Sequence, residues 1–169
     1  MSEADGVLAD WAAGFNHRST AADVLPAHHP ECLGCGPDNA HGHHLQVRRA
    51  GERVVSEHVF DARHVGAPGI AHGGAVATVV DDLFGFVLYL VGEPAVTRHL
   101  EVDYHAPVLL QRRYVLEARL ERREGRKLFV EATGTDDAGN TAFTAKALFV
   151  VVPLQHFAGA AAGDPPVAP

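Results

Sequence analysis

The chain has 169 residues, 47% of them apolar, which is enough to fill the core of one domain and well above what a disordered chain carries. Its formal net charge of −7 argues against a surface that neutralises nucleic-acid phosphates or anionic lipid, so we expect neither nucleic acid nor a membrane as a partner. The longest apolar run, Leu83 to Val91, is shorter than the roughly 20 residues of a membrane-spanning helix. The N-terminus is acidic where a signal peptide is basic, which favours a cytoplasmic location.

Residues 1–41 are expected to form a short helix followed by an irregular loop. Apolar residues recur every three or four positions between Ala4 and Phe15, which predicts an amphipathic helix. Several prolines and glycines between Pro26 and Gly42 prevent regular structure there. This loop contains the two cysteines of the chain, Cys32 and Cys35, which a reducing compartment would keep as thiols unless a metal bound them.

Residues 42–153 are predicted to be the main domain. Apolar residues alternate on both sides of the turn at Gly51, which predicts two antiparallel strands from Leu45 onwards. The one long helical candidate of this region follows, from Gly74 to Val91. Glycine and proline turns then separate four further strands, at Ala95 to Tyr104, Arg113 to Arg122, Lys127 to Thr135 and Thr141 to Val152.

The expected fold class is α+β. One helix cannot cover both faces of a flat sheet of this size, so a curved antiparallel sheet of about six strands wrapped around one central helix is the economical packing. The last strand is apolar on both faces and is therefore expected inside the sheet. The sheet would leave apolar surface uncovered, which predicts a homodimer or a dimer of dimers. The tail, residues 154–169, is expected to be disordered.

The central helix has one apolar and one polar side when it is projected at 100° per residue. The broad apolar stripe is expected to face the sheet and contains Val76, Val79, Val80, Leu83, Val87, Leu90 and Val91. The opposite side is small or polar, with Ala77, Thr78, Asp81, Asp82, Gly85 and Tyr89. A polar group or another backbone is therefore expected to approach this side.

Two carboxylates of the polar side are candidates for chemistry. Small neighbours leave room above Asp81, and a desolvated aspartate in a cleft is a natural base or nucleophile. Asp82 is expected either to be solvated or to contact substrate. Thr78 is a further candidate for substrate binding.

The start of the helix is a candidate oxyanion site. Gly73 and Gly74 have no side chains, and their unpaired N–H groups at the helix N-terminus can approach a ligand closely. The alternative is that both glycines only permit a tight turn. In the same way, His72 is either part of the site or simply a capping residue.

A longer stretch carries a family resemblance. Pro68-Gly-Ile-Ala-His-Gly-Gly-Ala-Val-Ala-Thr-Val-Val-Asp81 resembles the phenylacetyl-CoA thioesterase-like branch of the hotdog superfamily, including its human relatives. Cys32-Leu-Gly-Cys-Gly-Pro-Asp-Asn39 and Val102-Asp-Tyr-His-Ala-Pro107 agree with it. The likeness covers about residues 30 to 152.

This resemblance implies an enzyme that hydrolyses acyl-CoA thioesters in a site shared between two subunits, without a cofactor or a catalytic metal. It assigns the role of the acidic catalytic residue, as nucleophile or general base, to Asp81. It assigns the carbonyl-polarising amide to Gly73 and a water-positioning hydroxyl to Thr97. Some relatives have Asn six residues before the motif histidine, where this chain has Gly66. We expect His64 to orient the carbonyl instead.

Three alternatives stay open. Cys32 and Cys35, among nearby histidines, satisfy the ligand inventory of a structural zinc site; the histidines are His28, His29, His41, His43 and His44. A hotdog hydratase or dehydratase would use His72 and Asp81 as its acid and base pair. A non-catalytic acyl-CoA-binding protein is the third possibility. Coenzyme A phosphates could meet cations near strand ends, namely Arg98, Arg112, Arg113, Arg122, Arg123, Arg126 and Lys127.

Overall fold

The computed structural model describes residues 3–15 and 24–161. Its helices and strands follow in the order α1 (Glu3–Gly14), β1 (Arg48–Ala50), β2 (Arg53–Val59), the 3-10 helix η1 (Ala62–His64), β3 (Val65–Ala67), β4 (Ile70–Ala71), α2 (Gly73–Val91), β5 (Ala95–Tyr104), β6 (Arg113–Glu124), β7 (Lys127–Asp136), β8 (Thr141–Val151) and α3 (Gln155–Ala161).

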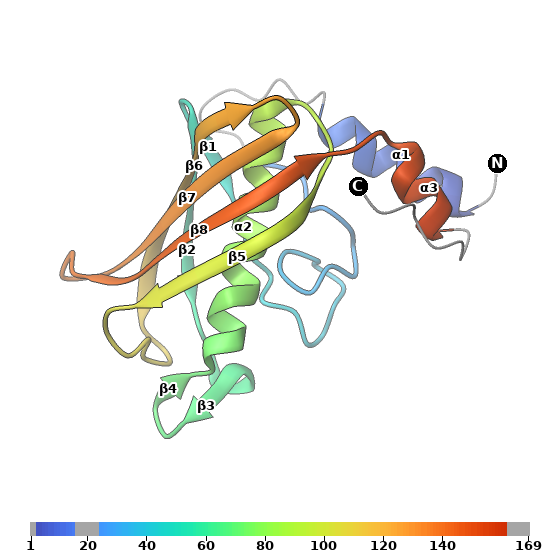
Figure 1. The fold of residues 1–169 in the computed structure, drawn as a ribbon. Coiled ribbons are helices and arrows are strands. Elements are labelled where there is room, and N and C mark those ends of the chain that lie inside the picture. Colours follow the sequence, from blue (N-terminus) through green and yellow to red (C-terminus); the bar gives the residue numbers. More distant parts are fainter. Residues whose placement is uncertain (1–2, 16–23, 162–169) are drawn as a thin grey trace.

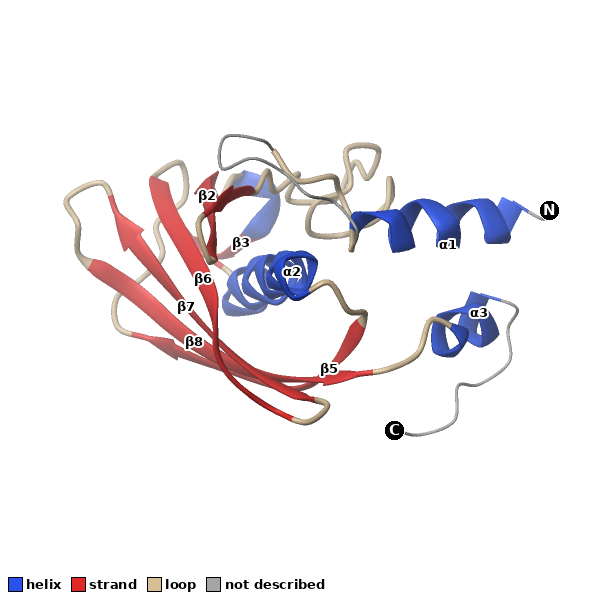
Figure 2. Ribbon diagram, turned by 90° about the horizontal axis from the view of Figure 1, so that it is seen from above, coloured by secondary structure: helices blue, strands red, loops and turns tan. Residues whose placement is uncertain are grey.

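The centre of the fold is one antiparallel sheet that curves around α2 (Figures 1 and 2). Its six strands lie in the order β1-β2-β6-β7-β8-β5. The predicted succession of two strands, one long helix and four strands is confirmed, as is the position of β8 inside the sheet. This arrangement is the expected α+β hotdog fold.

The core lies between α2 and the concave face of the sheet. Five residues of the predicted stripe are buried, namely Val76, Val79, Val80, Leu83 and Val87, whereas Leu90 and Val91 are only partly buried. Phe84 and Phe86 are buried as well, because α2 is covered on more than its sheet-facing side. By length and hydropathy α2 could also cross a membrane, but here it has the burial of a core helix.

A long loop, residues 24–47, covers the side of α2 that the sheet leaves open. Figure 2 shows this loop on the opposite side of α2 from the sheet. Leu25 anchors its beginning, because the Leu25 N–H donates to the Val47 carbonyl at 2.7 Å and the side chain is buried. The predicted approach of another backbone to the polar side of α2 is therefore made by this chain itself.

Two local predictions were wrong. The segment before α2 contains the short antiparallel pair β3 and β4, where the sequence indicated only a loop. The tail was expected to be disordered from residue 154, yet residues 155–161 form α3, which packs against α1 (Figure 1). The Trp11 and Phe157 ring centroids lie 4.5 Å apart, so aromatic packing accounts for this helix. The remaining tail, residues 162–169, lies outside the described residues.

Candidate functional site

The N-terminus of α2 presents one backbone N–H group that has no partner in the part of the chain described. His72 is the N-cap, and its Nδ1 accepts from the Gly74 N–H at 2.9 Å. The Gly74 amide, one of the predicted substrate contacts, is therefore already engaged. The Gly73 N–H stays free to donate, while the Gly73 carbonyl accepts from the Tyr104 hydroxyl at 2.6 Å.

Close backbone packing holds this helix start in place. The His72 N–H donates to the His64 carbonyl at 2.8 Å. A Cβ at Gly66 would lie 2.6 Å from the His72 Cα, so a side chain at position 66 would collide with the backbone before α2. This contact gives a physical reason for glycine at the position where some relatives have Asn.

His64 does not lie where a carbonyl-orienting group was expected. Its imidazole stacks on that of His43 with ring centroids 3.7 Å apart, and 9% of its side chain is exposed. The contribution of His64 to the site is its backbone carbonyl, which accepts from His72. The sequence could not separate these roles, because they depend on which way the ring turns.

Asp81 and Thr97 come together as the resemblance implied. The Thr97 hydroxyl on β5 donates to Asp81 Oδ1 at 3.0 Å. Burial raises the pKa of Asp81 above the usual range of an aspartate, and the hydrogen bond from Thr97 partly offsets this rise. The β5–β8 register shifts between Thr97 and His99, so an irregularity of the edge strand accompanies the contact. The pair can hold and orient a water molecule or a carbonyl group.

Two other predicted contacts are used inside the protein. Thr78 donates its hydroxyl to the Gly74 carbonyl at 2.9 Å, one turn earlier in α2. Asp82 is neither solvated nor on an open surface, since its side chain is 8% exposed beneath the 24–47 loop. Its carboxylate contacts His28 and Cys32. Substrate contact with Asp82 is therefore corrected to an internal contact with the loop.

The spacing of Gly73 and Asp81 limits what one chain can do. Eight residues of α-helix separate them, which corresponds to about 12 Å along the helix axis at roughly 1.5 Å per residue. A hydrogen-bond donor and a base or nucleophile must both lie within about 3 Å of the reacting group. Gly73 and Asp81 of one α2 are therefore too far apart along the helix to act on the same thioester carbonyl.

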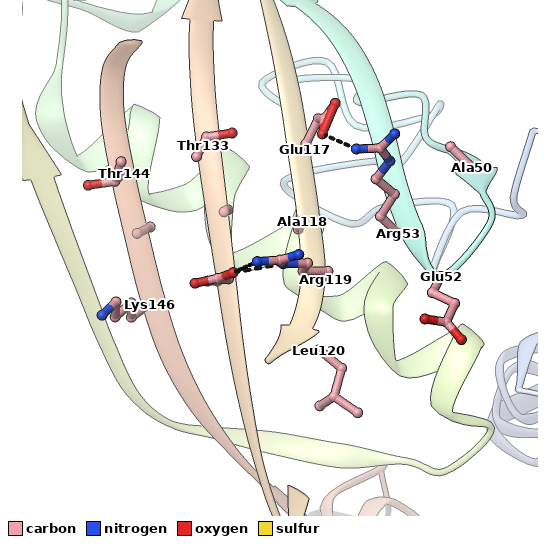
Figure 3. A pocket seen from close by; sticks show the side chains of 13 residues that line it. Ala50, Glu52, Arg53, Glu117, Ala118, Arg119, Leu120, Thr133, Thr144 and Lys146 are labelled. Carbon is pink, nitrogen blue, oxygen red and sulfur yellow. Dashed lines mark hydrogen bonds and ion pairs between the residues drawn. The ribbon is translucent and has the colours of Figure 1, made fainter. Parts of the chain in front are cut away.

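Two surface hollows differ in their suitability for a substrate. A mostly apolar pocket of about 410 Å³ lies beside the helix start and is lined by Gly73, Val76 and the segment from Tyr104 to Val108. A larger hollow of about 680 Å³ lies over the sheet surface that faces away from α2 (Figure 3). Its Arg53 and Arg119 form ion pairs with Glu117 and Glu131. The smaller pocket is the one adjacent to the candidate oxyanion site.

Replacing Thr97 by Ala is expected to lower turnover by about threefold to tenfold, the effect of losing one hydrogen bond worth roughly 0.7–1.4 kcal/mol. Thr97→Ser keeps the hydroxyl and should retain nearly all activity. Steady-state rates of the two variants, compared with circular dichroism of each, check this prediction. Complete loss of activity in a folded Thr97→Ala protein would mean that the hydroxyl is more than an accessory.

A separate histidine cluster should make the protein sensitive to acid. His43 and His58 are buried with ring centroids 5.6 Å apart, and His64 lies against His43. Burial, followed by the repulsion from His64, lowers the pKa of His58 to about 4, although Asp61 acts in the opposite direction. The pKa of His43 is lowered to about 4 in the same way, with a further small lowering from Arg63.

The unfolded chain therefore takes up protons on these rings at a higher pH than the folded protein does. The contribution of these two histidines to the free energy of unfolding is expected to be complete above about pH 6.5 and to be lost as the pH drops towards 4. His58 alone accounts for at most roughly 3 kcal/mol of this loss. Urea unfolding at pH 7 and 4.5 measures this loss. His58→Gln should reduce it and His41→Gln, at an exposed position, should not. Equal losses in both variants would contradict the assignment.

Comparison with known proteins identifies relatives of this domain. The model of the thioesterase superfamily matches residues 68–143. The acyl-coenzyme A thioesterase THEM4 of Rattus norvegicus is 40% identical over 103 residues, which are 60% of this chain and 44% of the relative. The human acyl-coenzyme A thioesterase THEM5 is 29% identical over 90 residues, which are 53% of this chain and 36% of that protein. The chain thus spans less than half the length of these relatives.

Solved structures share the fold at low sequence identity. A crystal structure of a thioesterase superfamily protein covers 86% of this chain and 76% of its own, with a TM-score of 0.69 and 21% identity. The E. coli PaaI protein from the phenylacetic acid degradation operon covers 66% and 81%, with a TM-score of 0.61 and 12% identity. A Streptococcus mutans protein bound to acetyl CoA covers 60% and 82%, with a TM-score of 0.57 and 22% identity.

Proposed function

We propose that the protein is an acyl-CoA thioesterase that hydrolyses its substrate to a free acid and CoA, since residues 68–143 match the model of the thioesterase superfamily and the chain has the hotdog fold. The observation that carries the proposal is the half-buried Asp81 carboxylate, bonded to Thr97 on the polar side of α2. Two relatives that are 40% identical to this chain, from Rattus norvegicus and Mus musculus, bear the name acyl-coenzyme A thioesterase.

The free Gly73 amide polarises the thioester carbonyl. In the reaction, negative charge develops on the carbonyl oxygen, and an N–H at a helix N-terminus stabilises that charge. The apolar pocket beside Gly73 receives part of the acyl group. His72 supports the donor indirectly, because it caps the helix through Gly74.

Asp81 acts in one of two ways. As a general base it takes a proton from water while the water oxygen adds to the carbonyl carbon, and the C–S bond then breaks. As a nucleophile it adds to the carbonyl carbon itself, expels CoA thiolate and forms an anhydride that water cleaves. In both cases the thiolate is a good leaving group, so the site needs no strong acid behind it.

We propose that two copies of the chain build each site. The spacing of Gly73 and Asp81 along α2 requires a second copy for one thioester to contact both groups. β5 is the last strand of the sheet and is ten residues long, and no described residue pairs with its outer edge. Such an edge is suited to strand pairing with another chain. A homodimer, alone or as half of a dimer of dimers, satisfies both observations.

Arg98 is the cation that we assign to the CoA phosphates. Of the basic residues near strand ends, Arg112, Arg113, Arg122 and Arg123 form ion pairs with carboxylates. Arg98 has no such partner among the described residues and follows Thr97 directly at the irregularity of β5. An exposed guanidinium beside the reacting centre is well placed to bind a phosphate.

The proposal is tested with a panel of short, long and aromatic acyl-CoAs and a reagent that detects the released thiol. Hydrolysis is expected to release one CoA and one free acid for each substrate consumed. Tight binding of an acyl-CoA without release would favour the non-catalytic alternative. Addition of water to an enoyl-CoA without thiol release would favour the hydratase alternative instead.

A further inference from the structure

Four potential metal ligands from two distant parts of the chain meet on the polar side of α2. His28, Cys32 and Cys35 come from the 24–47 loop, and Asp82 comes from the middle of α2. His28 Nδ1 lies 2.9 Å from Asp82 Oδ1 and 3.3 Å from Cys35 Sγ. Cys32 Sγ lies 3.1 Å from the same Asp82 oxygen. All four donor atoms lie within 4.8 Å of one another.

We propose that His28, Cys32, Cys35 and Asp82 bind one Zn²⁺ ion that joins the N-terminal loop to α2. Zinc bonds of about 2.0–2.3 Å in a tetrahedron give ligand-to-ligand separations of roughly 3.3–3.8 Å. The three separations of 2.9, 3.1 and 3.3 Å would widen by a few tenths of an ångström to enclose the ion, and no pair of donor atoms is more than 4.8 Å apart. Two sulfurs, one nitrogen and one oxygen form a ligand set that zinc accepts.

The burial of the cluster also points to a cation. The side chains of Asp82 and His28 are 8% and 15% exposed. Asp82 Oδ2 is buried and has no hydrogen-bond partner among the described residues. A buried carboxylate oxygen without a donor is costly, and a bound metal ion would satisfy it. Nothing in the proposed hydrolysis uses this group.

Two glycines provide the space for the cluster. A Cβ at Gly34 would lie 2.2 Å from Asp82 Cγ, and a Cβ at Gly85 would lie 2.7 Å from His28 Cε1. The loop can therefore lie directly on the carboxylate, and the imidazole can lie directly on the helix. A side chain at either position would push the ligands apart, so glycine at both positions is consistent with a site that binds an ion.

The two thiols would bind the ion as thiolates. Zinc takes deprotonated sulfur as its ligand, so the bound ion would displace the protons of Cys32 and Cys35 and make both sulfurs ligands.

The closed set of four protein ligands assigns the ion a structural role. A catalytic zinc keeps a position for water or substrate, whereas a structural zinc has four protein ligands. Two other histidines of the loop are engaged elsewhere, since His43 stacks on His64 and His44 Nε2 lies 2.7 Å from the Asn39 carbonyl oxygen. The ion would fix the loop to α2 one residue beyond Asp81.

The test is metal analysis of the full chain purified without a histidine tag from zinc-supplemented medium, followed by replacement with Co²⁺. We expect one zinc per chain and, with Co²⁺, thiolate-to-cobalt charge-transfer bands together with the visible bands of a tetrahedral ion. Cys32→Ser and Asp82→Asn should weaken binding at least tenfold. His29→Gln, which changes an exposed histidine of the same loop, should retain the zinc and the spectrum.

If the ligand variants do not fold, Co²⁺ titration of the chelator-treated wild-type protein still tests whether the site binds a metal ion through its thiolates. Cobalt binding without thiolate charge transfer would overturn the proposal, as would zinc-free protein that gives no cobalt spectrum. A Cys32–Cys35 disulfide, seen as a mass lower by two hydrogens in protein that binds no metal, would also overturn it. These measurements do not depend on thioesterase activity, so the two proposals can fail independently.

Discussion

Asp81→Asn is expected to lower the rate of acyl-CoA hydrolysis by at least about 100-fold, the low end of what a positioned acid or base contributes. Asn keeps the shape of the side chain and can still accept from Thr97, but it is neither a base nor a nucleophile. Substrate should still bind, so the loss should appear in kcat. The free energy of unfolding should hold or rise, since a desolvated carboxylate is costly to bury.

The matched control for this variant is Asp137→Asn, at an exposed position in the turn between β7 and β8. Its rate should stay within about threefold of wild type, or roughly 0.7 kcal/mol of barrier. Sequence alone makes Asp82→Asn the obvious control, but Asp82 contacts His28 and Cys32 beneath the loop and is unsuitable. A folded Asp81→Asn protein with full activity on every acyl-CoA that the wild type cleaves would refute the mechanism.

Gly73→Pro is expected to lower kcat by about 100-fold to 1000-fold, as the loss of one oxyanion donor does in other enzymes. Proline removes the one N–H that the mechanism needs, yet it is well tolerated at the first position of a helix. His72 already has φ −62° and ψ 132°, the extended conformation that a residue before proline adopts. Stability should therefore change little.

Gly73→Ala is the control for that variant, because it adds a side chain and keeps the amide. A Cβ at position 73 would lie 3.4 Å from the Tyr104 hydroxyl, which is an ordinary contact. The alanine variant should stay within about tenfold of wild type, or roughly 1.4 kcal/mol of barrier. If proline and alanine reduce the rate equally in folded proteins, bulk at the helix start and not the amide is what matters.

The sequence predicted the fold well where long strands are separated by clear turns. β5, β6, β7 and β8 have 10, 12, 10 and 11 residues, and their predicted starts coincide with the observed ones. α3 was missed because its stability depends on a distant partner, the Trp11 ring on α1. The pair β3 and β4 was missed because strands of two or three residues carry no period.

The candidate site was predicted in part. The resemblance placed Asp81 and Thr97 in one site, and the structure brings them into contact. It did not indicate that the loop covers Asp82, because Cys32 lies 50 residues away in sequence and no local pattern encodes the contact. Tyr104 was missed as a partner of the Gly73 carbonyl. These roles depend on the direction in which each side chain points in the folded protein, and the sequence alone does not give that direction.

Subunit complementation tests the central claim most directly, namely that Gly73 of one copy and Asp81 of another act on one thioester. Asp81→Asn and Gly73→Pro chains with different affinity tags are co-expressed, and the mixed assembly is purified through both tags. Each parent assembly should release CoA at no more than about 1% of the wild-type rate. In a mixed dimer one of the two sites has both wild-type groups, so the account predicts about a quarter to a half of the wild-type rate. A mixed assembly, verified by mass, that releases CoA no faster than its parents would contradict the shared site.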